Sequence, residues 1–340
     1  MKNFKIFAIN PGSTSTKIAL FEGEECLFTK NISHGAEELK SFKRVKDQLG
    51  FRKDTIIKET ALAEISLNSV DAFVGRGGGL MPLEGGVYEV NDKLLEDARA
   101  CIAGEHPATL GAQIANEFAE EFSVKSFVVN PPDVDEFKNI SRITGLKGVF
   151  RESRIHALNQ KEIGMRYADE VEKRYEDINL IIAHIGGGIS VTAHEKGKMI
   201  DSNDVLNGDG PMAPTRCGFI PLKKIIKMCF SGEYTKEQLN EKLTKSGGLV
   251  DHLETSDVKE ILERINKGDS HAKLVFDAMV YQIAKEIGSM SVALEGKVDS
   301  IILTGGISNS SYVTEKITSM TKFIAPVRVM AGEFEMEALA

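Results

Sequence analysis

The chain has 340 residues, of which 42% are hydrophobic and 27% charged, and no stretch is dominated by one residue type. This length and composition are typical of a globular protein with two domains, not of a disordered chain. The formal net charge of -8 argues against a nucleic-acid-binding surface, and the apolar runs are too short to cross a membrane. Four cysteines without metal spacing and no signal peptide lead us to expect a cytoplasmic protein.

The first half of the chain alternates strands and helices. Apolar runs predict strands at residues 4–9, 17–21, 26–32, 70–74 and 126–129. Helical periodicity predicts helices at residues 36–48, 53–65, 91–103 and 108–121. The turn between the first two strands is polar and rich in hydroxyl groups.

The second half opens in the same way. Strands are predicted at residues 179–184, at 189–194, near Met199, at 300–303 and at 327–330. Helices are predicted at residues 158–175, 222–230, 236–243, 257–266 and 270–294, and a last one begins near Glu333 with no stop signal before residue 340. We therefore expect that helix to be cut short. Because the order strand, turn, strand, turn, strand starts once at Phe4 and again at Asn179, the sequence predicts a duplicated α/β architecture.

Three turns after strands have the composition of nucleotide-binding turns. The first is Asn10-Pro11-Gly12-Ser13-Thr14-Ser15-Thr16-Lys17, in which small residues, hydroxyls and a lysine could hold a polyphosphate, although an ordinary hairpin turn is the alternative. The others are His184-Ile185-Gly186-Gly187-Gly188 and Thr304-Gly305-Gly306-Ile307-Ser308. No P-loop is present, and the GxGxxA match at residues 208–213 contains a proline, which disfavours a dinucleotide-binding fold.

In order and spacing, these turns resemble the two phosphate motifs and the adenosine motif of acetate and sugar kinases, heat-shock ATPases and actin. Gly104-Glu105-His106, Ile155-His156-Ala157-Leu158-Asn159-Gln160-Lys161 and Asp209-Gly210-Pro211 are similar to motifs of the butyrate kinases in the acetokinase family. The resemblance covers essentially the whole chain. It implies two duplicated α/β lobes of the actin-like ATPase or ribonuclease H-like type, at residues 1–157 and 158–340, with the active site in the cleft between them.

The resemblance also implies transfer of a phosphoryl group between ATP and a short-chain fatty acid, most closely butyrate, with ADP and Mg²⁺ as the other ligands. The residues that match the family's catalytic groups are Arg76, His106, His156 and Arg216. Those expected to bind the nucleotide are Asn10, Gly12, Ser13, Ser15, Lys17, His184, Gly186, Gly187, Gly188, Gly305, Gly306 and Ser308. Glu335 and Asn130 are the metal candidates. A carboxylate substrate is already ionised, so it needs no general base, but arginines must offset the repulsion between two anions.

Several alternatives stay open at this stage. The same site could serve acetate or propionate, and an ATP-binding module of the actin or heat-shock class is the rival that is not an enzyme. Asn130 stands where the family has an aspartate, so either Asp133 or Asp135 replaces that charge or Mg²⁺ depends on Glu335 and the phosphates. We expect Gly77, Gly78 and Gly79 to leave room for a longer acyl tail. The expected partners are a small carboxylate or acyl phosphate and further copies of the chain, with no nucleic acid and no membrane.

Overall fold

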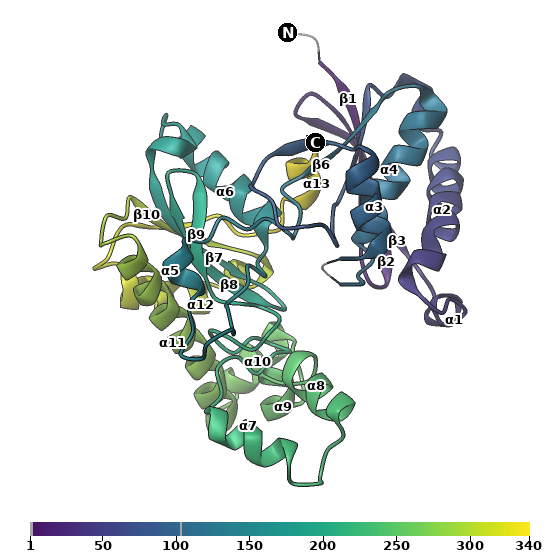
Figure 1. Cartoon of the computed structure of the whole chain (residues 1–340). Coiled ribbons are helices and arrows are strands. Elements are labelled where there is room, and N and C mark those ends of the chain that lie inside the picture. The colour runs from purple at the N-terminus through teal and green to yellow at the C-terminus, as the bar shows by residue number, and fades with distance from the viewer. Residues whose placement is uncertain (1–2, 103) are drawn as a thin grey trace. The chain divides into compact units, whose positions relative to one another are not determined.

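The computed structural model describes residues 3–102 and 104–340, and the chain divides into two compact units, each built on its own sheet (Figure 1). The first unit comprises Met1–Asp135, Ala157–Asn159 and Phe334–Ala340, and the second comprises Glu136–His156 and Gln160–Glu333. These bounds differ from the predicted lobes in three places, because residues 136–156 belong to the second unit and residues 158–159 and 334–340 belong to the first. The predicted functional lobes remain a prediction.

The first unit contains a mixed sheet in the order β3-β2-β1-β4-β6-β5. Its strands are β1 (Lys5–Pro11), β2 (Ser15–Glu22), β3 (Glu25–Ser33), β4 (Ala72–Gly75), β5 (Val87–Glu89) and β6 (Lys125–Val129). The first three strands are antiparallel, whereas β4 pairs parallel with β1 and with β6. The carboxyl ends of β1 and β4 therefore lie side by side, where ligands bind in open α/β sheets.

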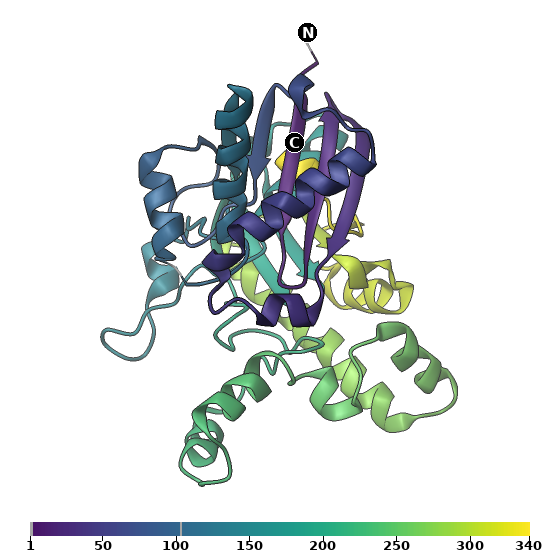
Figure 2. The same ribbon diagram turned by 90° about the vertical axis from the view of Figure 1, so that its right-hand side faces the viewer.

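Helices cover both faces of this sheet. The helices of the first unit are α1 (Ala36–Lys40), α2 (Leu49–Leu62), α3 (Asp92–Ala100), α4 (Thr109–Phe122) and α13 (Glu335–Leu339). One face packs Phe7, Ile9 and Phe73 against α2 and α4, and α2 runs across the strands in Figure 2. The opposite face packs Ala8 and Ala19 against α13. Alternate residues of β1 thus point into different cores, as a strand with two covered faces requires.

The second unit repeats this topology in a sheet of order β11-β10-β7-β8-β9. Its strands are β7 (Asn179–Ile185), β8 (Ile189–Glu195), β9 (Lys198–Ser202), β10 (Ser300–Thr304) and β11 (Val327–Val329). Strands β7, β8 and β9 are antiparallel, and β10 is parallel to β7, as β4 is to β1. The predicted duplication and the predicted α/β fold class are confirmed.

The helices numbered between β6 and β11 are α5 (Asn139–Arg142), α6 (Ala157–Glu170), α7 (Leu222–Cys229), α8 (Lys236–Thr244), α9 (Leu249–Leu253), α10 (Val258–Asn266), α11 (Ser270–Ala293) and α12 (Ser311–Thr321). Helix α11 packs on one face of the sheet against Ile189, Val191 and Ala193 of β8. The alternate residues of β8, which are polar, face away from α11.

Some expected elements differ from the structure. The helix predicted at residues 36–48 is wrong, because α1 ends at Lys40 and only the 3-10 turn Val45–Gln48 precedes α2. Strand β5 and helices α5, α9 and α12 were not predicted. Residue 103, the last of a predicted helix, lies outside the described residues. Across the described parts of the chain, we find no helix with the length and hydropathy that spanning a membrane requires.

Candidate active site

The turn between β1 and β2 is held from below by a buried arginine. The amide of Gly12 donates a hydrogen bond to Ser15 O at 2.8 Å, which closes the turn. Arg52 of α2 is fully buried and donates to Ser15 O and to Thr16 Oγ1, both at 2.9 Å. Ser13 stays exposed at the tip of the turn. The predicted phosphate turn therefore rests on a buried, hydrogen-bonded guanidinium. Arg52 was not predicted as a site residue, because it lies between the helices predicted at residues 36–48 and 53–65 and its local sequence does not indicate burial.

Three of the predicted residues meet at the carboxyl ends of β1 and β4. Arg76 follows β4 directly, and its backbone amide donates to Ile9 O at 2.8 Å. Its Nη1 forms an ion pair with the Glu335 carboxylate, and Asn10 Nδ2 donates to the other carboxylate oxygen at 2.7 Å. The side chains of Arg76 and Glu335 are 16% and 27% exposed. A catalytic candidate, a nucleotide candidate and a metal candidate thus form one cluster within the first unit.

His106 lies within the electrostatic reach of two guanidinium groups. Its Nδ1 accepts a hydrogen bond from the Ala108 amide at 3.1 Å, which fixes the ring at the start of α4. Desolvation by the surrounding chain lowers the pKa of His106, and the positive charges of Arg76 and Arg52 lower that pKa further. A neutral imidazole beside Arg76 suits a site for an anionic group.

Asn130 already has a local partner. Its Oδ1 accepts a hydrogen bond from the Gly86 amide at 2.8 Å, and its own amide donates to Gly86 O at 3.0 Å. Its φ of 39° is in the left-handed region, which asparagine tolerates better than most residues. Among the described residues, no group of three or more His, Cys, Asp or Glu side chains is arranged to hold a metal ion. The two metal assignments therefore remain predictions, and Glu335 brings a single carboxylate.

The second unit places two predicted histidines in contact. The rings of His156, at the start of α6, and His184, in β7, stack with centroids 4.0 Å apart and planes 17° apart. His156 Nδ1 is 2.8 Å from Ser190 Oγ, and His184 Nε2 is 3.9 Å from the Glu333 carboxylate. Each ring therefore has a polar partner within the second unit.

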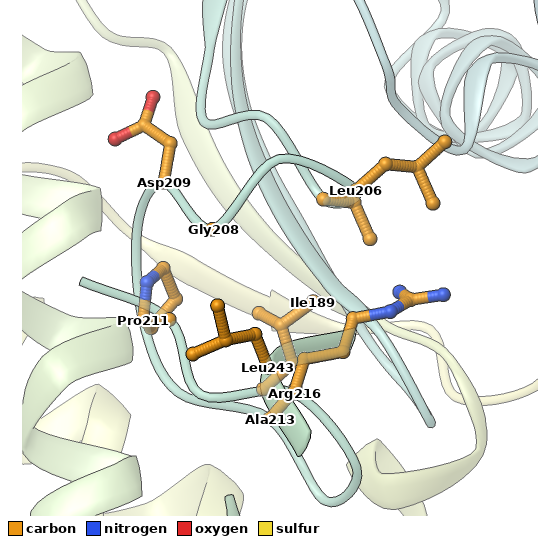
Figure 3. Close-up of a pocket in the computed structure, with 10 residues that line it drawn as sticks. Ile189, Leu206, Gly208, Asp209, Pro211, Ala213, Arg216 and Leu243 are labelled. Carbon is orange, nitrogen blue, oxygen red and sulfur yellow. The ribbon is translucent and has the colours of Figure 1, made fainter. Parts of the chain in front are cut away.

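Arg216 lies directly against the second glycine turn. A Cβ atom added at Gly188 would be 1.7 Å from Arg216 Nη1, so only a glycine leaves room for the guanidinium. Within the described chain, this buried Nη1 has no hydrogen-bond acceptor, and burial lowers the pKa of Arg216. Figure 3 shows the small cavity beside it, about 10 Å³ in volume, which Ile189, Leu206 and Pro211 help to line. A buried guanidinium nitrogen without an acceptor is suited to contact with an anionic group.

The third glycine turn borders a larger cavity of about 550 Å³. Gly306 lines it, whereas Gly305 and Ser308 are not among its lining residues. A Cβ at Gly305 would be 2.5 Å from Ile185 O, and Ser308 Oγ donates to Thr304 O at 2.7 Å. The cavity is also lined by Ser256 and by Asp257, the N-cap of α10, which was predicted from sequence only as the start of a helix. The volume suits a small organic ligand.

The three glycines after Arg76 do not leave an open pocket, so this expectation was wrong. A Cβ at Gly77 would be 2.8 Å from Pro131 Cβ, and one at Gly78 would be 3.1 Å from Ala108 Cβ. A Cβ at Gly79, where φ is +70°, would be 2.8 Å from Thr109 Cγ2. The space beside these glycines is already occupied, because the start of α4 and the loop after β6 pack against them.

Comparison with known proteins identifies relatives over almost the whole length of the chain. The family model described as "Acetokinase family" matches residues 145–327. A protein named butyrate kinase 2 from Clostridium acetobutylicum is 46% identical over 99% of this chain and 95% of its own length. The solved acetate kinase of Porphyromonas gingivalis has a TM-score of 0.80 at 18% identity, covering 98% of each chain. The propionate kinase of Francisella tularensis has a TM-score of 0.74 at 21% identity, covering 99% of this chain and 98% of its own.

Proposed function

This chain belongs to the acetokinase family, and we propose that it transfers the terminal phosphoryl group of ATP to a short-chain fatty acid, most readily butyrate. The observation that carries the proposal is the buried Arg216 Nη1 against Gly188, which has no acceptor among the described residues. Transfer between two anions needs such a charge, because carboxylate and phosphoryl oxygens repel each other as they approach.

The reaction needs no base from the protein. A carboxylate oxygen of the acid forms a bond to the γ-phosphorus, and the bond from that phosphorus to the bridging oxygen breaks. The electron pair leaves with ADP, and the product is an acyl phosphate. We assign Arg216 and Arg76 to the charges of the carboxylate and phosphoryl group, and His156 and His106 to neutral contacts with them.

The residues present fit ATP. The cavity beside Gly306 has the volume and the backbone surface that an adenosine needs, and we assign Gly186, Gly187 and Gly188 and the turn from Gly12 to Lys17 to the phosphates. We assign Mg²⁺ to Glu335 and the nucleotide phosphates, since Mg²⁺ commonly takes one or two carboxylates and keeps several waters. When bound, the ion would neutralise charge on the phosphates.

We further propose a cytoplasmic homo-oligomer. All four cysteines are free thiols, which suits a reducing compartment. Leu222 and Ile226 of α7 are exposed, and Phe219 and Phe230 beside that helix are 71% and 87% exposed. An apolar patch of this kind is suited to contact with another chain.

The proposal is tested by trapping the acyl phosphate as a hydroxamate. Purified protein with ATP and Mg²⁺ is given formate, acetate, propionate, butyrate or isobutyrate, and initial rates are compared. We expect the highest specificity constant with butyrate. A maximum with acetate or propionate would assign the chain to those acids instead, and ATP binding without hydroxamate from any acid would support an ATP-binding module and refute the kinase.

A further inference from the structure

A row of buried polar side chains leads away from His156 on the face of β8 that is turned away from α11. Ser190 Oγ lies 2.8 Å from His156 Nδ1 and accepts a hydrogen bond from Gln160 Nε2 at 2.7 Å. Gln160 Oε1 lies 2.8 Å from His194 Nε2, and His194 Nδ1 lies 2.5 Å from the Tyr175 hydroxyl. Gln160, Ser190 and His194 are fully buried, and Tyr175 is 6% exposed.

One backbone carbonyl sets the direction of the whole row. Ser190 O can only accept, and it lies 3.2 Å from the side-chain amide of Gln160. The nitrogen of that amide must therefore face Ser190, and its oxygen must face His194. Because Gln160 Oε1 can only accept, His194 must donate from Nε2.

The protonation state of His194 determines the direction of its hydrogen bond with Tyr175. Burial lowers the pKa of His194 well below its usual value, and the charge of Lys161 lowers it further, so the ring is neutral and carries its one hydrogen on Nε2. His194 Nδ1 is then an acceptor, and the Tyr175 hydroxyl donates to it. Burial raises the pKa of Tyr175, which keeps this hydroxyl protonated.

The hydroxyl of Ser190 determines the direction of its hydrogen bond with His156. Its oxygen already accepts from Gln160, and its hydrogen needs an acceptor because an unpaired buried donor is costly. In the part of the chain that the structure describes, the acceptor found within hydrogen-bond distance is His156 Nδ1. Ser190 therefore donates to His156 Nδ1, and His156 carries its hydrogen on Nε2.

We infer that Ser190, Gln160, His194 and Tyr175 are positioning residues that hold His156 as the neutral tautomer protonated at Nε2. The tautomer itself follows from the hydrogen bonds, and only its role rests on the proposed function. In that role, His156 Nε2 donates its hydrogen to an anionic oxygen of the substrate. His194, to which the sequence analysis gave no role, becomes part of the active site's support. The opposite tautomer would present a lone pair to that oxygen and repel it.

The test reads the tautomer directly from the ring nitrogens of His156 by NMR of the whole, ligand-free protein at neutral pH, with His156→Gln used to assign the signals. We expect the Nε2-protonated pattern in the unmutated chain. A hydrogen on Nδ1, or on both nitrogens, would overturn the inference whatever the protein catalyses. Conversely, an unmutated chain with the Nε2 hydrogen that forms no hydroxamate would refute the proposed function and leave the positioning residues intact.

Gln160→Glu reverses the row of hydrogen bonds without changing its shape. An ionised carboxylate cannot donate, so Ser190 would donate to it and accept from His156 Nδ1. We expect the His156 signals to move to the Nδ1-protonated pattern and kcat to fall about 100-fold, the cost of losing one well-placed donor, with KM for butyrate little changed. Lowering the pH should restore part of kcat, because the introduced carboxyl group can donate as the amide did once it is protonated.

Two further variants keep the test decisive. Ser190→Ala removes the donor to His156 without adding a charge, and should give mixed tautomers and a loss of kcat of similar size. Thr192→Val is the matched control, since Thr192 is a buried hydroxyl residue two positions along β8 whose Oγ1 lies 2.8 Å from Ser202 Oγ, outside this row. If Thr192→Val lowers kcat as much as Ser190→Ala does, or if Ser190→Ala leaves the tautomer and kcat unchanged, the inference is wrong.

Discussion

At the scale of single residues, the position of Arg216 depends on the absence of a side chain at Gly188. A Cβ at Gly188 would be 1.7 Å from Arg216 Nη1 and 2.8 Å from Val205 Cγ1, so the turn and the guanidinium fit together only without a side chain. The hydroxyl of Thr215 also donates to Gly187 O at 3.2 Å, which ties the arginine's loop to the same turn. Gly188 is therefore required for the position of the Arg216 guanidinium.

We therefore predict that Gly188→Ala lowers kcat for acyl phosphate formation by about 100-fold or more, because the guanidinium must move away from its charge-stabilising position. Gly187→Ala is the comparison, since a Cβ there meets no atom within 4 Å. Steady-state rates of both variants at saturating ATP decide the matter. Equal losses in the two variants would show that the turn tolerates no side chain and that Arg216 is not the reason.

Arg216 itself should be close to indispensable. We predict that Arg216→Ala lowers kcat by about a thousandfold while ATP binding stays nearly unchanged, because the charge acts mainly in the transition state. Arg216→Lys should recover little, since an ammonium group cannot bridge two sets of oxygens as a planar guanidinium does. Activity and melting temperature are measured together, and a folded Arg216→Ala protein within tenfold of the unmutated rate would remove Arg216 from the mechanism.

These residues show what sequence can and cannot give at this scale. The resemblance to family motifs identified Arg76, Arg216, His156 and the glycines of the predicted nucleotide-binding turns, because each lies in a short sequence motif. The partners of Arg76 and Arg216 were not predictable, since Glu335 and Gly188 are distant in sequence from them. Arg52 was not predicted because its partners, Ser15 and Thr16, are also distant from it in sequence.

At the scale of elements, helix α4 approaches the end of β4 unusually closely. A Cβ at Gly75 would be 2.1 Å from Gly111 O, and one at Gly111 would be 2.1 Å from Arg76 O. Two facing glycines therefore allow the helix backbone to contact the chain at Arg76, one of the predicted catalytic residues. This contact also places His106, just before α4, close to Arg76.

Gly111→Ala is therefore expected to separate α4 from β4. The added methyl overlaps backbone atoms that cannot move aside, and we predict a loss of about 1–3 kcal/mol or more in the free energy of unfolding of the first unit. Urea unfolding followed by circular dichroism measures it. Gly50→Ala in α2 of the same unit is the control, since its Cβ meets nothing within 4 Å and should change stability by less than about 1 kcal/mol. Equal stability of the two variants would refute the close contact.

Periodicity predicted most elements because most strands are buried and apolar. The residues of β7 and β10 are almost all buried, and their apolar runs were recognised within one or two residues. Strand β5 was missed because it is a three-residue edge strand with two exposed residues. Helix α12 was missed because threonine and serine dilute its apolar face, and the helix predicted from residue 36 breaks at Ser41, whose hydroxyl donates to Glu38 O at 2.6 Å.

At the scale of the whole molecule, the last residues return to the first unit. Met336 and Leu339 of α13 are buried with Ala8 and Ala19 on the face of the first sheet opposite α2 and α4. These residues were predicted to belong to the second lobe, because the order of elements along the chain does not indicate that a short helix packs on a distant sheet. The consequence for the site is that Glu335 reaches Arg76 and Asn10.

This return gives the last prediction. If Glu335 is the protein's carboxylate for Mg²⁺, Glu335→Gln should raise severalfold the Mg²⁺ concentration needed for half-maximal rate, because Mg²⁺ strongly prefers charged oxygen ligands. The same change removes the ion pair with Arg76. Rates across a range of Mg²⁺ concentrations, at saturating ATP and butyrate, separate the two roles, since a lower maximal rate with an unchanged Mg²⁺ requirement would mean that Glu335 only orients Arg76.

Glu337→Gln is the matched control for this experiment. Glu337 lies in the same helix and is exposed, so its replacement changes the charge of α13 equally without touching the Arg76 cluster. We expect its Mg²⁺ requirement and its melting temperature to match those of the unmutated chain. Asn130→Asp should also have little effect, because Asn130 Oδ1 already accepts from Gly86 and an aspartate oxygen can replace it there. A large drop in the Mg²⁺ requirement of Asn130→Asp would instead place the metal at the end of β6, because the new carboxylate would then be one of its ligands.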